Sequence, residues 1–133
     1  MIRKSIKVKI NWLRPDEDGR NPLIGCYHYR PTIIFMDSKN ERHWSFFLDF
    51  YSLPEYDQPT VAEGAFLADF STNEPWGKMT KGTIFYVMEG TQKIGIGTVL
   101  EESRDIDTSN LPSSIYPYET SISAACAYPG TLK

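Results

Sequence analysis

Residues 82–101, GTIFYVMEGTQKIGIGTVLE, are the stretch that decides the fold. Two runs rich in β-branched and aromatic residues, Gly82–Glu89 and Lys93–Glu101, are separated by the three residues Gly90-Thr91-Gln92. A short connection that contains glycine between two such runs is typical of a β-hairpin. The sequence therefore predicts that this region is two antiparallel strands joined by a tight turn.

The second run of this hairpin alternates between glycine and larger side chains. Because side chains alternate across a strand, Gly95 and Gly97 are expected on one face, and Ile94, Ile96 and Thr98 on the other. Glycine inside a strand marks a bulge or the close approach of another backbone. We therefore expect a bulge or a close backbone contact at Gly95 and Gly97.

The same glycines come close to a phosphate-binding loop, which reads G-x-x-x-x-G-K-[ST]. Gly90 and Gly95 have the required spacing, but Ile96 stands where that loop has its lysine. A neutral isoleucine cannot supply the positive charge. A phosphate loop also opens a helix, whereas Thr98-Val99-Leu100 is typical of a strand. The motif is therefore not interpreted as a nucleotide site.

The rest of the chain predicts an all-β fold. Hydrophobic alternation marks a half-buried strand over Ser5–Leu13 and another over His43–Phe50, where Trp44, Phe46, Leu48 and Phe50 share a face. A shorter strand follows the Arg-Pro step at 32–37, and 62–71 is interpreted as a strand after a turn at Glu63-Gly64. No stretch keeps a helical period over three turns. Short strands at this spacing indicate a barrel or a sandwich.

Composition indicates one cytoplasmic domain of 133 residues with a formal charge of −3. Residues 1–30 carry seven basic and three acidic groups, so this segment is basic in an acidic chain. We expect no membrane span, because no apolar run is long enough, and no signal peptide, because the first residues lack an apolar centre. The two cysteines, Cys26 and Cys126, are expected to be plain thiols.

Side chains suited to catalysis or metal binding are scattered. Cys26 and His28 would share a face in a strand, but no third group that could orient them stands out. Two cysteines and two histidines at these positions do not form a zinc pattern. We therefore expect no enzyme activity, no cofactor and no metal.

Two segments carry motifs that occur together in a known family. The motifs are Asp18-Gly19-Arg20, Asn21-Pro22 and Tyr29-Arg30-Pro31 in the first segment, and Phe85, Glu89, Gly90, Gly95, Gly97 and Val99 in the second. Over about residues 5 to 102, the chain resembles the C-terminal (third) domain of bacterial elongation factor Tu. That resemblance implies a six-stranded antiparallel β-barrel over 1–102. The chain adds a Ser/Pro-rich extension over 103–133, which we expect to pack on or beside the barrel.

The resemblance also implies a site. In the family the Glu-Gly of the last hairpin lies near the tRNA backbone, which points to Glu89 and Gly90 here, with Lys93 as the nearest positive residue. The chain departs from the family because it has no GTPase domain and no second barrel. A lone third domain could not deliver tRNA, and a shared fold does not establish a shared function.

Two functions remain open. The first is a non-catalytic module that binds a protein, with Arg20, Arg30, Trp44 and Tyr51 as contact candidates, since such residues make good interface anchors. An immunity or antitoxin-like protein and a translation-associated protein are particular forms of it. The alternative is a weak tRNA- or ribosome-binding module, which the basic N-terminal segment supports and the overall acidity opposes.

Overall fold

The structure is a computed structural model that describes residues 2–17, 19–20, 23–36, 42–66 and 74–107. Its elements in chain order are β1 (Ile2–Trp12), the 3-10 helix η1 (Pro15–Glu17), β2 (His28–Tyr29), β3 (Thr32–Phe35), β4 (Trp44–Phe50), β5 (Thr60–Phe66), the one-turn helix α1 (Glu74–Gly77), β6 (Ile84–Glu89), β7 (Gln92–Val99) and β8 (Arg104–Asp107). Residues 67–71, the end of a predicted strand, and residues 108–133 of the predicted extension lie outside the described residues.

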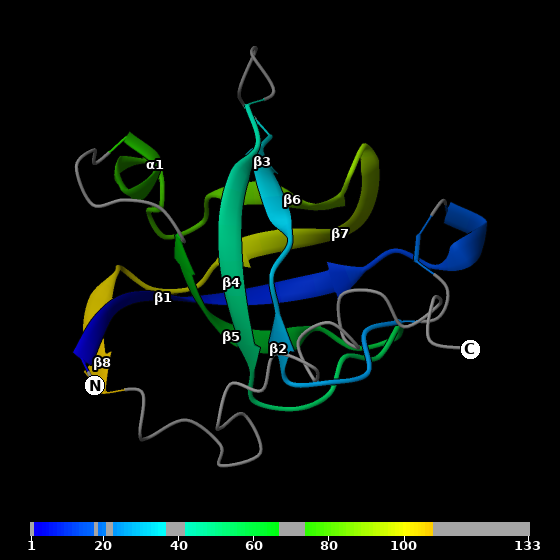
Figure 1. Cartoon of the computed structure of the whole chain (residues 1–133), viewed down its shortest axis with the longest axis horizontal. Helices are drawn as coiled ribbons and strands as arrows, with labels where there is room; N and C mark the ends of the chain where they lie inside the picture. Colours follow the sequence, from blue (N-terminus) through cyan, green and yellow to red (C-terminus); the bar gives the residue numbers. More distant parts are fainter. Residues whose placement is uncertain (1, 18, 21–22, 37–41, 67–73, 108–133) are drawn as a thin grey trace.

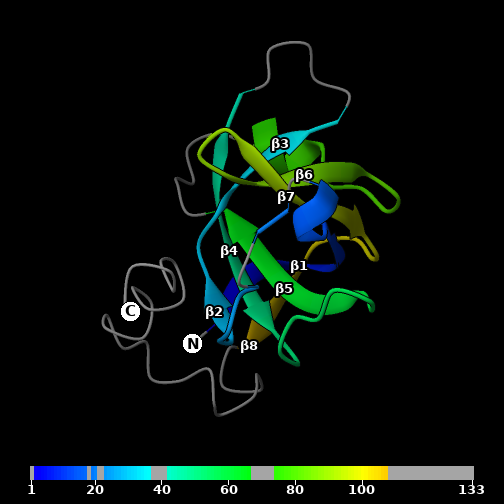
Figure 2. The same ribbon diagram turned by 90° about the vertical axis from the view of Figure 1, so that its right-hand side faces the viewer.

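Six antiparallel strands close into a barrel in the order β4, β3, β6, β7, β1 and β5, and β5 pairs back with β4. The long strand β1 pairs with β5, with β7 and, through its first residues, with β8 (Figure 1). Turning the molecule shows the strands wrapped around one interior (Figure 2). The predicted all-β, six-stranded barrel is confirmed. The short strand β2 pairs with Leu48 and Asp49 of β4, on the edge opposite β5.

The alternation that predicted the strands also predicts the core. The inward face of β1 carries Ile6, Val8, Ile10 and Trp12, and the inward face of β4 carries Phe46, Leu48 and Phe50; all seven are buried. Trp12 also donates a 2.9 Å hydrogen bond from Nε1 to Thr60 Oγ1, which satisfies its polar atom. Burying large apolar side chains stabilises the barrel by about 1.5–3 kcal/mol for each one.

Glycines leave room for aromatic rings inside the barrel. A Cβ on Gly97 would overlap the ring of Phe85, and a Cβ on Gly64 would overlap the ring of Phe46. A Cβ on Gly95 would meet Ile10 Cγ2 at 2.9 Å. The space beside these glycines is therefore already filled, as their positions in the hairpin led us to expect for Gly95 and Gly97.

One expectation about the hairpin is wrong. Ile94 is expected on the same face as Ile96 and Thr98, but it is fully buried in the core whereas these two side chains are only half-buried. The reason is an irregularity in the pairing of β6 with β7, where Val87 faces Gly95 and Met88 faces Lys93. Ile94 is the extra residue at this bulge, so the strict alternation breaks there.

One local prediction about the strands was also wrong. Glu63 and Gly64 do not form a turn; they lie in the middle of β5, opposite Lys7 and Ile6 of β1. A strand can hold a Glu-Gly pair here because Gly64 leaves room for the ring of Phe46, and Glu63, on the opposite face of the strand, is paired with Arg104. Strand β8, at the start of the predicted extension over 103–133, pairs with Ile2–Ser5 of β1.

We predict that Gly97→Ala lowers the free energy of unfolding by about 1–3 kcal/mol, because the added methyl must displace the ring of Phe85. Gly77→Ala is the matched control, since its Cβ would meet nothing within 4 Å. Urea denaturation of both variants measures the difference. Equal stability of Gly97→Ala and the native protein would contradict the packing role of this glycine.

Candidate partner-binding site

The carboxylate of Glu89 joins three segments that are far apart in the sequence. Arg20 donates from Nε to Glu89 Oε2 at 2.6 Å, and the Tyr29 hydroxyl donates to the same oxygen. Glu89 ends β6, Tyr29 ends β2, and Arg20 lies in the loop after η1. An ion pair with an additional hydrogen bond holds these segments in register.

Two further contacts fix the loop that carries Arg20. The Tyr56 hydroxyl donates to the carbonyl oxygen of Arg20, and Gln92 Nε2 donates to the carbonyl oxygen of Gly19 at 3.1 Å. Gly90 forms the hairpin turn with a φ of 60°, a conformation that glycine adopts without strain. The loop and the hairpin therefore lie against each other.

A hollow of about 320 Å³ opens beside this network. It is bounded on one side by the step from β2 into β3 and on the other by the end of β6 and the hairpin turn. Its lining residues are Tyr29, Arg30, Pro31, Thr32, Met88, Glu89 and Gly90. This volume falls at the small end of the range that ligand pockets occupy.

The structure brings some of the predicted contact residues together and keeps others apart. Arg20 and Glu89 pair directly, and Arg30 and Gly90 line the same hollow. Lys93 follows on the same hairpin, and its Nζ lies 4.2 Å from the centroid of the Tyr86 ring. Arg20 is itself buried, and its ion pair positions the Glu89 carboxylate.

Trp44 and Tyr51 lie away from the hollow, at opposite ends of β4. Trp44 is partly buried and packs edge-on against Phe66, with ring centroids 6.3 Å apart. Tyr51 is 40% exposed just after β4 ends. The aromatic residues of this strand are thus divided: Phe46 and Phe50 belong to the core, whereas Tyr51 lies at the surface.

The basic N-terminal segment does not form a free patch. Of the six lysine and arginine side chains described in residues 4–30, five have a described partner: Lys4 with the Trp76 ring, Lys7 with Glu101, Arg14 with Asp57, Arg20 with Glu89 and Arg30 with the Phe47 ring. Pairing with carboxylates reduces the charge that this segment offers to a polyanion.

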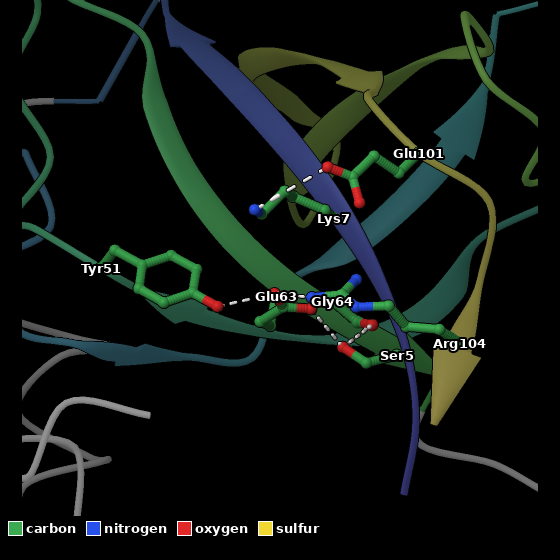
Figure 3. A network of polar contacts seen from close by, with 7 residues as sticks. All are labelled: Ser5, Lys7, Tyr51, Glu63, Gly64, Glu101 and Arg104. Carbon is green, nitrogen blue, oxygen red and sulfur yellow. Dashed lines mark hydrogen bonds and ion pairs between the residues drawn. The ribbon is translucent and has the colours of Figure 1, made fainter. Parts of the chain in front are cut away.

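A second polar cluster, centred on Glu63, was missed by the sequence analysis. Glu63 Oε1 accepts a 2.7 Å hydrogen bond from Ser5, and Oε2 accepts 2.7 Å bonds from Tyr51 and from Arg104 of β8 (Figure 3). Glu63 is fully buried, yet it faces the outside of the barrel wall. Three donors compensate this buried charge, as a carboxylate in such a place requires.

The cluster changes the acidity of its members. Burial and the hydrogen bond to Glu63 raise the pKa of Tyr51 to about 12. Burial alone would lower the pKa of Arg104, but the hydrogen bond and charge of Glu63 outweigh it and raise this pKa. Both shifts hold protons on the donors that surround Glu63, so the cluster serves as a structural clamp for β8 and for the end of β4.

The Glu63 cluster continues across the sheet. Lys7, Glu63, Asp49 and His28 occupy directly opposed positions on β1, β5, β4 and β2. His28 Nδ1 lies 2.8 Å from Asp49 Oδ1, and both side chains are buried. Asp49 is the orienting partner of His28 that sequence reasoning did not find. The register of four strands creates this row, and no local sequence motif predicts it.

The expected plain thiol at position 26 is wrong, because Cys26 is disulfide-bonded. A sulfur in a disulfide carries no thiolate, so Cys26 is not a nucleophile in this state. Cys126 lies outside the described residues. Over the part of the chain that the structure describes, no group of three His, Cys, Asp or Glu side chains could hold a metal ion.

No protein-family model matches the chain, and a search of curated proteins finds no matching sequence. The resemblance to the third domain of elongation factor Tu therefore stays a prediction. Among the described residues, no helix is long and apolar enough to cross a membrane.

We predict that Tyr51 makes stability fall at alkaline pH. Between the ordinary pKa of 10.0 and about 12, the unfolded phenol loses its proton while the folded phenol keeps it, so stability present below pH 10 is lost as pH rises. The free energy of unfolding, measured by urea titration across this range, should fall less steeply in Tyr51→Phe. Identical slopes would contradict the assignment.

We predict that Arg104→Met destabilises the protein by about 2 kcal/mol, because Glu63 then keeps only hydroxyl donors for a buried charge. Arg104→Lys, which retains the charge, should lose less. The double variant Arg104→Met/Glu63→Gln should recover part of the loss, since the unpaired charge is gone. Thermal and urea denaturation of these three variants and of Glu63→Gln measure this; additive losses from the two single substitutions would argue against the ion pair.

Proposed function

We propose that this protein is a non-catalytic protein-binding module, and that its contact surface surrounds the hollow between Tyr29–Thr32 and Met88–Gly90. The observation that supports this most strongly is the Glu89 network, which fastens three separate segments around an open hollow. Groups held in place before association lower the entropic cost of binding. The barrel supplies the rigid support.

The chemistry around the hollow favours binding over catalysis. Its carboxylate, Glu89, is already engaged by Arg20 and Tyr29. Its hydroxyl, Thr32 Oγ1, lies 3.1 Å from His43 Nδ1, but no described acidic side chain contacts His43 to orient it. An activated nucleophile needs such a base held by a third group. These contacts support a surface that recognises rather than transforms its partner.

A protein partner fits the charges better than RNA does. A nucleic-acid site usually presents a concentrated basic patch, and the chain has an isoelectric point near 5.4. Five of the six described cations of residues 4–30 are already paired with carboxylates or aromatic rings. Phosphates would have to displace these contacts.

Within this proposal, an immunity or antitoxin-like role and a translation-associated role are the two forms considered. A small acidic domain suits the neutralisation of a basic toxin through electrostatic complementarity.

The cytoplasm is the proposed location. The disulfide at Cys26 counts against it, because disulfides are uncommon in reducing compartments. Fractionation of the host cell decides this point.

We predict that Thr32→Phe weakens partner binding by about tenfold or more, because the new ring fills the hollow. Tagged native protein would be used to capture partners from its own host's lysate at about 150 mM salt, near physiological ionic strength. The recovered partner would then be titrated against each variant. Circular dichroism confirms that the variants are folded.

The matched control is Thr98→Phe, the same substitution on the outer face of β7 and away from the hollow lining. A stoichiometric protein bound by the native chain and by Thr98→Phe, but weakly by Thr32→Phe, supports the proposal. Equal binding by both variants would place the contact elsewhere. Recovery of tRNA or ribosomes that is lost as salt rises would favour the RNA function instead.

A further inference from the structure

The carboxylate of Glu89 is engaged on one side only. Arg20 and Tyr29 both donate to Oε2, whereas Oε1 accepts no hydrogen bond from the described residues. The side chain of Glu89 is 29% exposed and lines the hollow. A carboxylate offers about four acceptor positions over its two oxygens, so Oε1 retains the capacity to bind a further donor.

The walls beside Glu89 suit the hydrocarbon part of a long side chain. Met88 and Pro31 are buried residues that line the hollow, and the Tyr29 ring lies next to them. Lysine and arginine carry an apolar stem behind a charged head, and they bury the stem where the head finds a partner. Methionine adapts its shape to such a stem.

The cation already at the rim, Arg30, stacks elsewhere. Its guanidinium carbon lies 4.6 Å from the centroid of the Phe47 ring on β4. The Glu89 ion pair is made by Arg20, which approaches from the loop after η1. Neither Arg20 nor Arg30 therefore occupies the position from which a further donor would reach Glu89 Oε1.

We propose that the hollow receives the cationic side chain, an arginine or a lysine, of the protein partner, with its N–H groups donating to Glu89 Oε1. This inference rests on the proposed function, and it specifies the chemistry of the partner's anchor. The chain's net charge of −3 favours encounter with a basic partner surface. The Glu89 carboxylate in the wall opposes a phosphate or a carboxylate as the occupant.

The test uses peptides as the probe. Acetyl-Gly-Arg-Gly-amide is titrated into the full chain while the backbone amide signals of Thr32, Glu89 and Gly90 are followed by NMR. The control peptide carries citrulline, which has the shape of arginine without its charge. Amides of Phe35 and Ile84, at the opposite ends of β3 and β6, serve as internal references.

We expect saturable shifts at Thr32, Glu89 and Gly90 with the arginine peptide, with a dissociation constant on the order of 1 mM for so small a ligand. The citrulline peptide should bind at least about tenfold more weakly. Glu101→Gln, which removes an equal charge away from the hollow, should still bind the arginine peptide. Glu89→Gln should lose it, and a melting curve establishes that this variant is folded.

Equal shifts with the citrulline peptide, or no saturable shift with either peptide, would overturn the inference. These outcomes differ from a failure of the proposed function. If Thr32→Phe loses its partner while the arginine peptide does not bind, the contact surface stands and the cationic anchor falls. If the peptide binds while Thr32→Phe keeps its partner, the hollow is a cation site outside the partner surface.

Discussion

The barrel depends on two phenylalanine rings that lie against glycines. The ring of Phe46 occupies the space beside Gly64 on the neighbouring strand β5, and that of Phe85 occupies the space beside Gly97 on β7. The two rings meet edge-to-face with centroids 6.0 Å apart. Since interiors pack densely, a larger residue at either glycine would separate the strands that close the barrel. The positions of the loops and of the hollow follow from that closure.

The outer wall follows a different rule. There a buried carboxylate, Glu63, is tolerated because Ser5, Tyr51 and Arg104 surround it with donors. The cluster joins β8 to strands of the barrel and continues to Asp49 and its partner on β2. A charge that is buried and paired contributes more to the specificity of an arrangement than to net stability, so we interpret the cluster as a clamp.

The candidate site was predicted in part. The motif resemblance singled out the segments with Arg20, Tyr29, Glu89 and Gly90, and the structure brings all four to one end of β6. The pairing of Arg20 with Glu89 was not predicted, because 69 positions separate them and no periodicity relates them. Composition suggested a basic N-terminal patch, but partners on β4, β6, α1 and two loops already engage most of those charges.

The sequence by itself determined most of the strands, the buried faces of β1 and β4, and the hairpin of β6 and β7. Alternation and turn residues are local properties, and local sterics express them wherever the chain goes. Only the tertiary structure decided that Ile94 is a core residue, that Glu63 is buried and that Glu89 borders a hollow. Each of these depends on register between strands far apart in the chain, and register is set by the packing of the whole barrel.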